Sequence, residues 1–237
     1  MKTETLEYRD GGTVCRGFLA TPDGSDKRPG ILIVHEAPGL DDHPKRRAPM
    51  LAELGYVALA ADLYGGGKVA MGEEAMKTMA PFRENRALAR GRARAALDAL
   101  AKVARADAGR LGAMGYCFGG YVVLELARSG ASLKGVVSFH GLLDAQNPDD
   151  AKNVKAKILV CTGADDPLVP PDQVLGFETE MTAAKVDWQV VTYGGAKHAF
   201  TNVNADKVGR AALGYNKAAD DRSWAAMRGF WQEMFGS

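Results

Sequence analysis

Hydrophobic residues along this chain of 237 residues occur in short runs that alternate with longer segments of mixed polar and apolar residues. The short runs are bounded by glycine and proline, which is typical of β-strands, whereas apolar spacings of three and four in the longer segments indicate helices. Predicted strands span residues 3–8, 14–20, 30–35, 56–61, 111–116, 135–140, 157–162 and 187–193, and predicted helices span 44–54, 82–103, 118–128, 172–184 and 223–235. This alternation predicts an α/β fold with a mostly parallel sheet flanked by helices on both faces.

The first two predicted strands differ from the others because they are expected to be antiparallel. Asp10, Gly11 and Gly12 separate them and favour a tight hairpin turn. The next strand, helix and strand, up to residue 61, predict a βαβ unit. Strands recur to the end of the chain without a change of composition, a linker or a repeat. We therefore expect residues 1–237 to form a single domain.

The predicted helix at 82–103 carries an apolar face beside a basic one. The apolar face consists of Ala89, Ala93, Ala96, Leu97, Leu100 and Val103. The basic face consists of Arg83, Arg86, Arg90 and Arg94. A helix that binds nucleic acid would be expected to combine such a face with interleaved aromatic residues in a basic chain. Neither feature is present, so we interpret the arginines as a solvated face.

Composition narrows the possible partners and location of the protein. The chain has 30 Lys and Arg against 29 Asp and Glu, a formal net charge of +1, which favours a small molecule over nucleic acid as the partner. Its apolar runs are far shorter than the roughly 18 residues that cross a membrane. The first ten residues are charged and lack the apolar segment of a secretory signal. We expect a cytoplasmic monomer or small homo-oligomer.

Three cysteines, Cys15, Cys117 and Cys161, are too few and too odd in number for a disulfide framework, and no C-x-x-C pair suggests zinc. Cys15 and Cys161 lie within predicted strands and are interpreted as small core residues. Cys117 stands between a predicted strand and a predicted helix, so its surroundings set it apart.

The segment around Cys117 reads Gly-Tyr-Cys-Phe-Gly-Gly over residues 115–120, a G-x-C-x-G pattern. A nucleophile on a sharp turn between strand and helix needs small neighbours so that the backbone can pass closely. Such a turn also places the backbone N–H of Phe118 at a helix N-terminus, where it can stabilise an oxyanion. The alternative is a glycine-rich turn around a structural cysteine.

A thiol nucleophile needs a base, and His198 lies on the loop that follows the predicted strand at 187–193. Asp165 and Asp166 follow the strand at 157–162 and offer a carboxylate to orient the imidazole. The resulting order of Cys, Asp and His is that of an α/β-hydrolase triad. His140 also ends a strand but precedes the acid, so we assign it a substrate-contact or core role.

His35 and Glu36 begin like a metal-binding motif, but the next histidine is His43, which misses the H-E-x-x-H spacing. Asp41 and Asp42 add carboxylates that keep a metal site as one alternative. A glycine-leucine turn after proline is a poor scaffold for such a site, so we expect a solvated loop here.

Taken in order, these motifs resemble the dienelactone hydrolase family of α/β-hydrolases. The resemblance rests on His35, Glu36, Gly39, Asp62, Leu63, Tyr64, the segment 115–120, Gly163, Asp166, Val169, Pro170, His198 and Phe200. It implies the α/β-hydrolase fold and the triad Cys117, Asp166 and His198. Between the adjacent acids, the family pattern picks Asp166, three residues after Gly163, and Asp165 is the second choice.

The resemblance also implies that Glu36 holds the resting cysteine as a protonated thiol, and that the backbone N–H of Ala37 is a second oxyanion donor beside Phe118. A carboxylate that only pairs with a nearby arginine is the alternative for Glu36. Members that act on dienelactone carry an arginine shortly after the His-x-Phe segment, where this chain has Asn202. We therefore expect a cofactor-free, metal-free hydrolase of a small ester or lactone. The alternative is a thiol redox or small-molecule-binding protein that uses the same cysteine.

Overall fold

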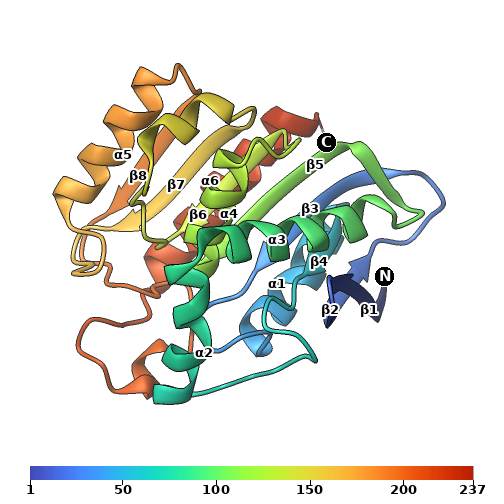
Figure 1. Ribbon diagram of the computed structural model, residues 1–237, viewed down its shortest axis with the longest axis horizontal. Helices are drawn as coiled ribbons and strands as arrows, with labels where there is room; N and C mark the ends of the chain where they lie inside the picture. Colours follow the sequence, from blue (N-terminus) through green and yellow to red (C-terminus); the bar gives the residue numbers. More distant parts are fainter. Residues whose placement is uncertain (237) are drawn as a thin grey trace. The chain divides into compact units, whose positions relative to one another are not determined.

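The computed structural model describes residues 1–236 and divides into two compact units. The first unit spans Met1–Met114, and the second begins at Gly115. In Figure 1 the first unit runs from blue to green and the second from green to red. The bounds of the observed elements agree with most of the predicted ones to within a few residues.

The N-terminal hairpin of the first unit forms as expected. Strand β1 (Lys2–Asp10) pairs antiparallel with β2 (Thr13–Thr21) along its whole length, and the turn falls on Gly11 and Gly12. Gly11 has a φ of +54°, a left-handed conformation that glycine adopts without strain. The turn residues thus set the register of the hairpin.

A βαβ unit follows the hairpin. Strands β3 (Arg28–Val34) and β4 (Val57–Ala60) are parallel, and helix α1 (Asp42–Glu53) connects them. Strand β2 pairs antiparallel with β4. The strand order is therefore β1-β2-β4-β3-β5, where β5 spans Ala106–Tyr116. The Asp41 side chain caps α1 by accepting a hydrogen bond from the His43 N–H at 3.1 Å.

The predicted helix at 82–103 is wrong in one respect, because the structure has two helices there. Helix α2 (Gly72–Glu84) ends before Asn85, and α3 (Arg86–Ala101) begins after it. Asn85 has an extended backbone, and its side chain accepts a hydrogen bond from the Leu88 N–H at 3.2 Å. One asparagine therefore ends α2 and caps the N-terminus of α3.

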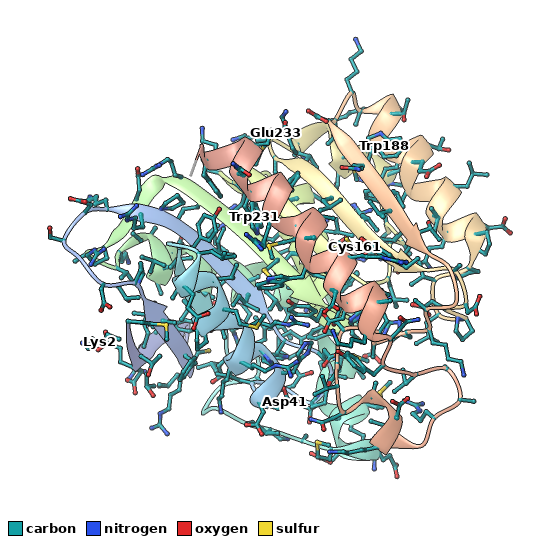
Figure 2. The ribbon with its side chains drawn as sticks, turned by 180° about the vertical axis from the view of Figure 1, so that it is seen from behind. Lys2, Asp41, Cys161, Trp188, Trp231 and Glu233 are labelled. Atoms are coloured by element: carbon teal, nitrogen blue, oxygen red, sulfur yellow. The ribbon has the colours of Figure 1, made fainter. Side chains whose placement is uncertain are left out.

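The two faces predicted for this region are found on α3 and the end of α2. Most of the apolar face is buried, namely Ala89, Ala93, Ala96, Leu97 and Leu100. The four arginines are half-buried and not fully solvated. Helix α3 packs on β1, β3 and β4, whereas α1 packs on β2, β3 and β4, and the two helices lie on opposite sides of these strands (Figures 1 and 2).

The second unit repeats the alternation of strand and helix. Strand β5 (Ala106–Tyr116) ends in this unit and is followed by α4 (Phe118–Arg128). Strands β6 (Gly135–Phe139), β7 (Lys157–Gly163) and β8 (Trp188–Tyr193) pair in parallel in that order. The remaining elements are η1 (Pro148–Asn153), α5 (Pro171–Ala183), η2 (Ala205–Val208) and α6 (Lys217–Phe235).

Two helices pack on the strands of this sheet. Every residue of α4 is buried, and α4 packs on β6. Helix α6 packs on β6 and β7. Figure 2 shows α6 crossing these strands and labels Trp231, which belongs to this helix. A Cβ at Gly135 would lie 2.8 Å from the Trp231 ring, so a larger residue would push α6 away.

Among residues 1–236, no helix is long and apolar enough to cross a membrane.

Candidate active site

Cys117 occupies a sharp turn between β5 and α4. Its backbone angles, φ 53° and ψ −115°, lie in a region that non-glycine residues rarely adopt. A Cβ at Gly115 would lie 2.1 Å from the Gly119 carbonyl oxygen, and one at Gly120 would lie 2.8 Å from Gly141 Cα. The glycines at these positions therefore permit the close passage of backbone that a nucleophile elbow requires.

The structure brings His198 into contact with Asp166. Asp166 Oδ2 lies 2.8 Å from His198 Nδ1, and both side chains are buried. The other oxygen of Asp166 accepts the Leu168 N–H at 2.9 Å, which fixes the carboxylate in place. Asp165 is exposed to solvent, so its neighbour Asp166 is the acid that orients the imidazole.

The backbone of the loop carrying His198 is also held on both sides. The His198 N–H donates to the Ala212 carbonyl at 3.1 Å, and the Gly214 N–H donates to the His198 carbonyl at 3.1 Å. These two backbone hydrogen bonds hold His198 in a fixed position on its loop.

Cys117 and His198 interact electrostatically. Burial lowers the pKa of His198, but the negative charge of Cys117, together with the hydrogen bond and charge of Asp166, outweighs burial and raises the pKa to about 10. Nε2 is buried and lies beside Cys117 without a tight hydrogen bond to it. The arrangement favours the protonated, imidazolium form of His198 beside Cys117.

Phe118 is the first residue of α4 and is buried. Its backbone N–H is one of the first donors of the helix, which have no acceptor within the helix itself. The helix dipole adds positive potential at this point. The N–H of Phe118 is therefore suited to stabilise negative charge that develops beside Cys117.

Glu36 and Ala37 lie in the first unit, directly after β3. Glu36 is buried, and its Oε2 accepts from His43 Nδ1 at 3.0 Å. Arg47 Nε in turn donates to His43 Nε2 at 3.4 Å. The Ala37 carbonyl accepts from the Tyr64 hydroxyl at 2.8 Å, which holds this peptide in place.

The prediction of a solvated loop around His43 is wrong. His43 lies in the first turn of α1 and is 5% exposed, and Arg47, one turn later, is 3% exposed. Glu36 accepts a hydrogen bond from His43, and His43 accepts one from Arg47. The three side chains therefore form one buried chain of hydrogen bonds. His43 immediately precedes the helix predicted at 44–54, and its four-residue spacing to Arg47 was the available sequence signal.

His35 is buried and neutral. Burial lowers its pKa to about 4. Its Nε2 accepts from the Leu63 N–H at 3.2 Å, so Nδ1 carries the proton and donates to the Glu36 carbonyl at 2.7 Å. Both ring nitrogens are thus occupied, which argues against the metal-site alternative for this segment. Within residues 1–236, no group of three His, Cys, Asp or Glu side chains could hold a metal ion.

The two other cysteines are buried, as expected for small core residues. Cys15 lies in β2 and Cys161 in β7, and both are fully buried. Burial raises the pKa of Cys161 to about 12. These thiols stay protonated and inaccessible, whereas Cys117 is partly exposed.

A sequence profile of the dienelactone hydrolase family matches residues 15–235. The chain belongs to this family. It is 28% identical to protein usf of Aquifex pyrophilus over 97% of this chain and 98% of that protein. It is 29% identical to a probable 2-oxo-3-(5-oxofuran-2-ylidene)propanoate lactonase of a Bradyrhizobium species, over 84% of this chain and 86% of that protein.

Solved structures agree with this assignment. A dienelactone hydrolase-like promiscuous phosphotriesterase from metagenomic libraries has a TM-score of 0.96 and 42% identity, with 99% of this chain and 98% of that chain covered. A putative dienelactone hydrolase of Klebsiella pneumoniae has a TM-score of 0.80 and 25% identity, over 97% of this chain and 98% of that chain. The predicted α/β-hydrolase fold is confirmed, and this family member is a lactone or ester hydrolase.

Proposed function

We propose that the protein hydrolyses a small ester or lactone through a triad of Cys117, His198 and Asp166 and an acyl-thiol intermediate. The observation that carries the proposal is the contact of 2.8 Å between Asp166 and His198. The charge of Cys117 also raises the pKa of this histidine, so the three side chains interact. A nucleophile, a base and an orienting acid in one buried cluster are what acyl transfer requires.

In the first half-reaction, the Cys117 thiolate attacks the carbonyl carbon. The oxyanion that forms accepts from the Phe118 N–H, and the family resemblance supplies the Ala37 N–H as second donor. The bond from carbon to the leaving oxygen then breaks, and that oxygen takes the proton from His198 Nε2. The acyl group remains on the sulfur as a thioester.

In the second half-reaction, His198 takes a proton from water while the water oxygen attacks the thioester carbon. The carbon–sulfur bond breaks and releases the acid, which returns Cys117 to the thiolate and His198 to the imidazolium. Asp166 accepts a hydrogen bond from Nδ1–H throughout and stabilises the cation. Neither step needs a cofactor or a metal.

For Glu36, the resemblance to the family supports a role in keeping the Cys117 thiol protonated before substrate binds. Displacement of Glu36 by substrate would then let the thiol proton pass to His198, which forms the thiolate that attacks. In this chain the buried pair of His43 and Arg47 is proposed to fix the orientation of that carboxylate. The hydrogen bond from His43 holds one oxygen of this carboxylate in place.

The substrate is proposed to be a neutral small ester or lactone. Asn202, which stands where members acting on dienelactone carry an arginine, cannot form an ion pair with a substrate carboxylate. Its amide is engaged locally, since its Oδ1 accepts from the Asn204 N–H at 3.0 Å. A substrate without a free carboxylate suits this position better.

A second candidate substrate is an aryl phosphotriester. The observation in its favour is the 42% identity to a structure described as a promiscuous phosphotriesterase. The same thiolate would attack phosphorus, and the aryl alcohol would leave with the proton from His198 Nε2. Water activated by His198 would then cleave the phosphorus–sulfur bond and regenerate the thiolate. Release of that alcohol by the wild type but not by Cys117→Ala would support this activity.

The two units are proposed to act as one catalytic domain, because the family profile runs through both of them. A monomer or small homo-oligomer would be sufficient. A reducing compartment such as the cytoplasm would keep the Cys117 thiol free for catalysis.

The deciding experiment is to trap the acyl-enzyme. The protein is mixed with p-nitrophenyl acetate and quenched in acid, and its mass and peptides are measured by mass spectrometry. We expect an acetyl group on Cys117. An enzyme that turns over the ester without any Cys117 adduct would contradict the mechanism, and a protein with neither turnover nor adduct would support the redox or binding alternative.

A further inference from the structure

His140, which the triad does not use, accepts a hydrogen bond from the backbone of Cys117. It follows β6 directly and is fully buried. The backbone N–H of Cys117 donates to two acceptors at once, the Phe139 carbonyl at 3.0 Å and Nδ1 of His140 at 3.1 Å. A side chain therefore helps to hold the backbone of the residue that carries the reactive sulfur.

The hydrogen bonds determine which nitrogen of His140 carries the proton. A backbone N–H can only donate, so Nδ1 is the unprotonated acceptor and the proton of the neutral ring is on Nε2. Nε2 lies 2.8 Å from Thr201 Oγ1 and donates to it. Thr201 is fully buried and lies three residues after His198. One imidazole thus connects the elbow to the segment that carries the base.

The backbone at His140 is held in an uncommon conformation. Its φ is +41°, a left-handed value that histidine, asparagine and aspartate tolerate better than most residues. The His140 N–H donates to the Cys161 carbonyl at 2.8 Å, which ties it to β7. The ring also lies edge-on to the His198 ring at 5.3 Å and to the Phe200 ring at 5.1 Å.

A neutral ring is required by these surroundings. A second proton on Nδ1 would remove the acceptor for the Cys117 N–H and would place a positive charge against the His198 imidazolium. Full burial opposes such a charge. The position is thus suited to holding the geometry of the elbow and not to proton transfer.

We propose that His140 is a positioning residue, whose neutral Nε2–H tautomer fixes Cys117 relative to His198 by linking the elbow to Thr201. This inference rests on the proposed function, because it assumes that Cys117 is the nucleophile and His198 the base. It assigns to this histidine a part of the core role predicted from its sequence position, in preference to the substrate-contact role.

Two pairs of variants test the proposal. His140→Ala removes both hydrogen bonds, whereas His140→Asn keeps an acceptor at the place of Nδ1 and tolerates the positive φ. Thr201→Val removes the acceptor of the Nε2 proton with little change of shape. Thr162→Val is its matched control, because Thr162 is equally buried and its hydroxyl has no hydrogen-bond partner within residues 1–236.

With p-nitrophenyl acetate we expect kcat to fall about 10- to 100-fold in His140→Ala, with KM nearly unchanged, because misplacement of reacting groups by less than 1 Å has effects of this size. His140→Asn should recover part of the loss, and Thr201→Val should lose about tenfold while Thr162→Val keeps the wild-type rate. Equal kcat for Thr201→Val and Thr162→Val, or wild-type kcat in His140→Ala, would overturn the proposal.

A measurement that does not depend on activity covers the case in which His140→Ala fails to fold. The ring nitrogens of His140 are assigned by NMR in the wild-type protein, and the Nε2–H tautomer is expected from pH 6 to pH 9. A proton on Nδ1 would overturn the proposal. Failure of the proposed function would instead show as wild-type turnover that survives Cys117→Ala, whatever the His140 variants do.

Discussion

Asp166 and His198 form a buried carboxylate–imidazole pair, joined at 2.8 Å, whose histidine also interacts with Cys117. Each member of this cluster comes from a different loop of the second unit. The pair determines how the imidazole is oriented and how much positive charge it can carry. Its contribution can therefore be measured by removing the carboxylate alone.

Asp166→Asn should lower kcat by about 10³- to 10⁴-fold, because the amide favours the wrong tautomer of His198 and cannot stabilise the imidazolium. Steady-state hydrolysis of p-nitrophenyl acetate measures the effect. Asp165→Asn is the matched control, since this neighbouring carboxylate is exposed. A larger loss in Asp165→Asn than in Asp166→Asn would reverse the assignment.

Cys117→Ala should abolish hydrolysis while the protein remains folded, because the alanine has no nucleophile but fits the same turn. The control is Cys161→Ala, which truncates a buried thiol that the mechanism does not use and should keep the wild-type rate. Circular dichroism checks the fold of both variants. Wild-type turnover in Cys117→Ala would remove the cysteine from the mechanism.

The interaction of Cys117 with His198 predicts a pH dependence of stability. The pKa of His198 is raised from 6.5 to about 10 in the folded protein, against burial, with the charge of Cys117 as the largest raising cause. A raised pKa stabilises the fold fully below pH 6.5, and this contribution is lost as the pH rises towards 10. Denaturant unfolding should show it as a decline between pH 7 and 10.

The same interaction can be measured by NMR titration of the His198 ring. In Cys117→Ala the pKa of His198 should fall well below its wild-type value, because burial then acts against fewer favourable charges. The decline of stability towards pH 10 should be weaker in this variant. An unchanged His198 titration would show that the thiolate does not stabilise the imidazolium.

The chain of Glu36, His43 and Arg47 predicts an effect on thiol reactivity. His43→Phe removes the donor to Glu36 and should change the rate at which iodoacetamide alkylates Cys117, as should Glu36→Gln. Asp42→Asn is the matched control because it removes an exposed charge from the same helical turn. If all three variants react at the wild-type rate, Glu36 and His43 serve only the packing of α1.

Arg128 predicts a large effect on stability. Its guanidinium forms two hydrogen bonds to Glu180, at 2.9 and 2.7 Å, and one to Glu125 at 3.1 Å, and all three side chains are buried. Arg128→Met would leave two buried carboxylates without their cation and should cost about 3–5 kcal/mol in the free energy of unfolding. The exposed ion pair of Lys157 with Glu233 supplies a control, and Lys157→Met should have little effect.

Hydrophobic periodicity was sufficient to predict most of the strands and helices. Most of the helices bury one face, and most of the strands bury a short apolar run. It was not sufficient at Asn85, where a single side-chain cap divides one apparent helix into two. It also missed α2, whose only buried residues are Ala75 and Phe82 and which therefore has no continuous apolar face.

The same contrast holds for the site. The glycine-flanked turn at Cys117 and the order of the three triad candidates are local in sequence, and they could be recognised without coordinates. The partners of Glu36 and the bridge made by His140 depend on contacts between distant segments. Sequence spacing alone does not specify such contacts, and for this reason His43 was assigned to a solvated loop.

The boundary between Met114 and Gly115 has a practical consequence for folding experiments. All three tryptophans, Trp188, Trp224 and Trp231, lie beyond it. Intrinsic tryptophan fluorescence therefore follows the second unit alone, whereas far-ultraviolet circular dichroism follows both. Coincident unfolding curves from the two methods would mean that the units melt as one cooperative body, and separate curves would give the order in which they melt.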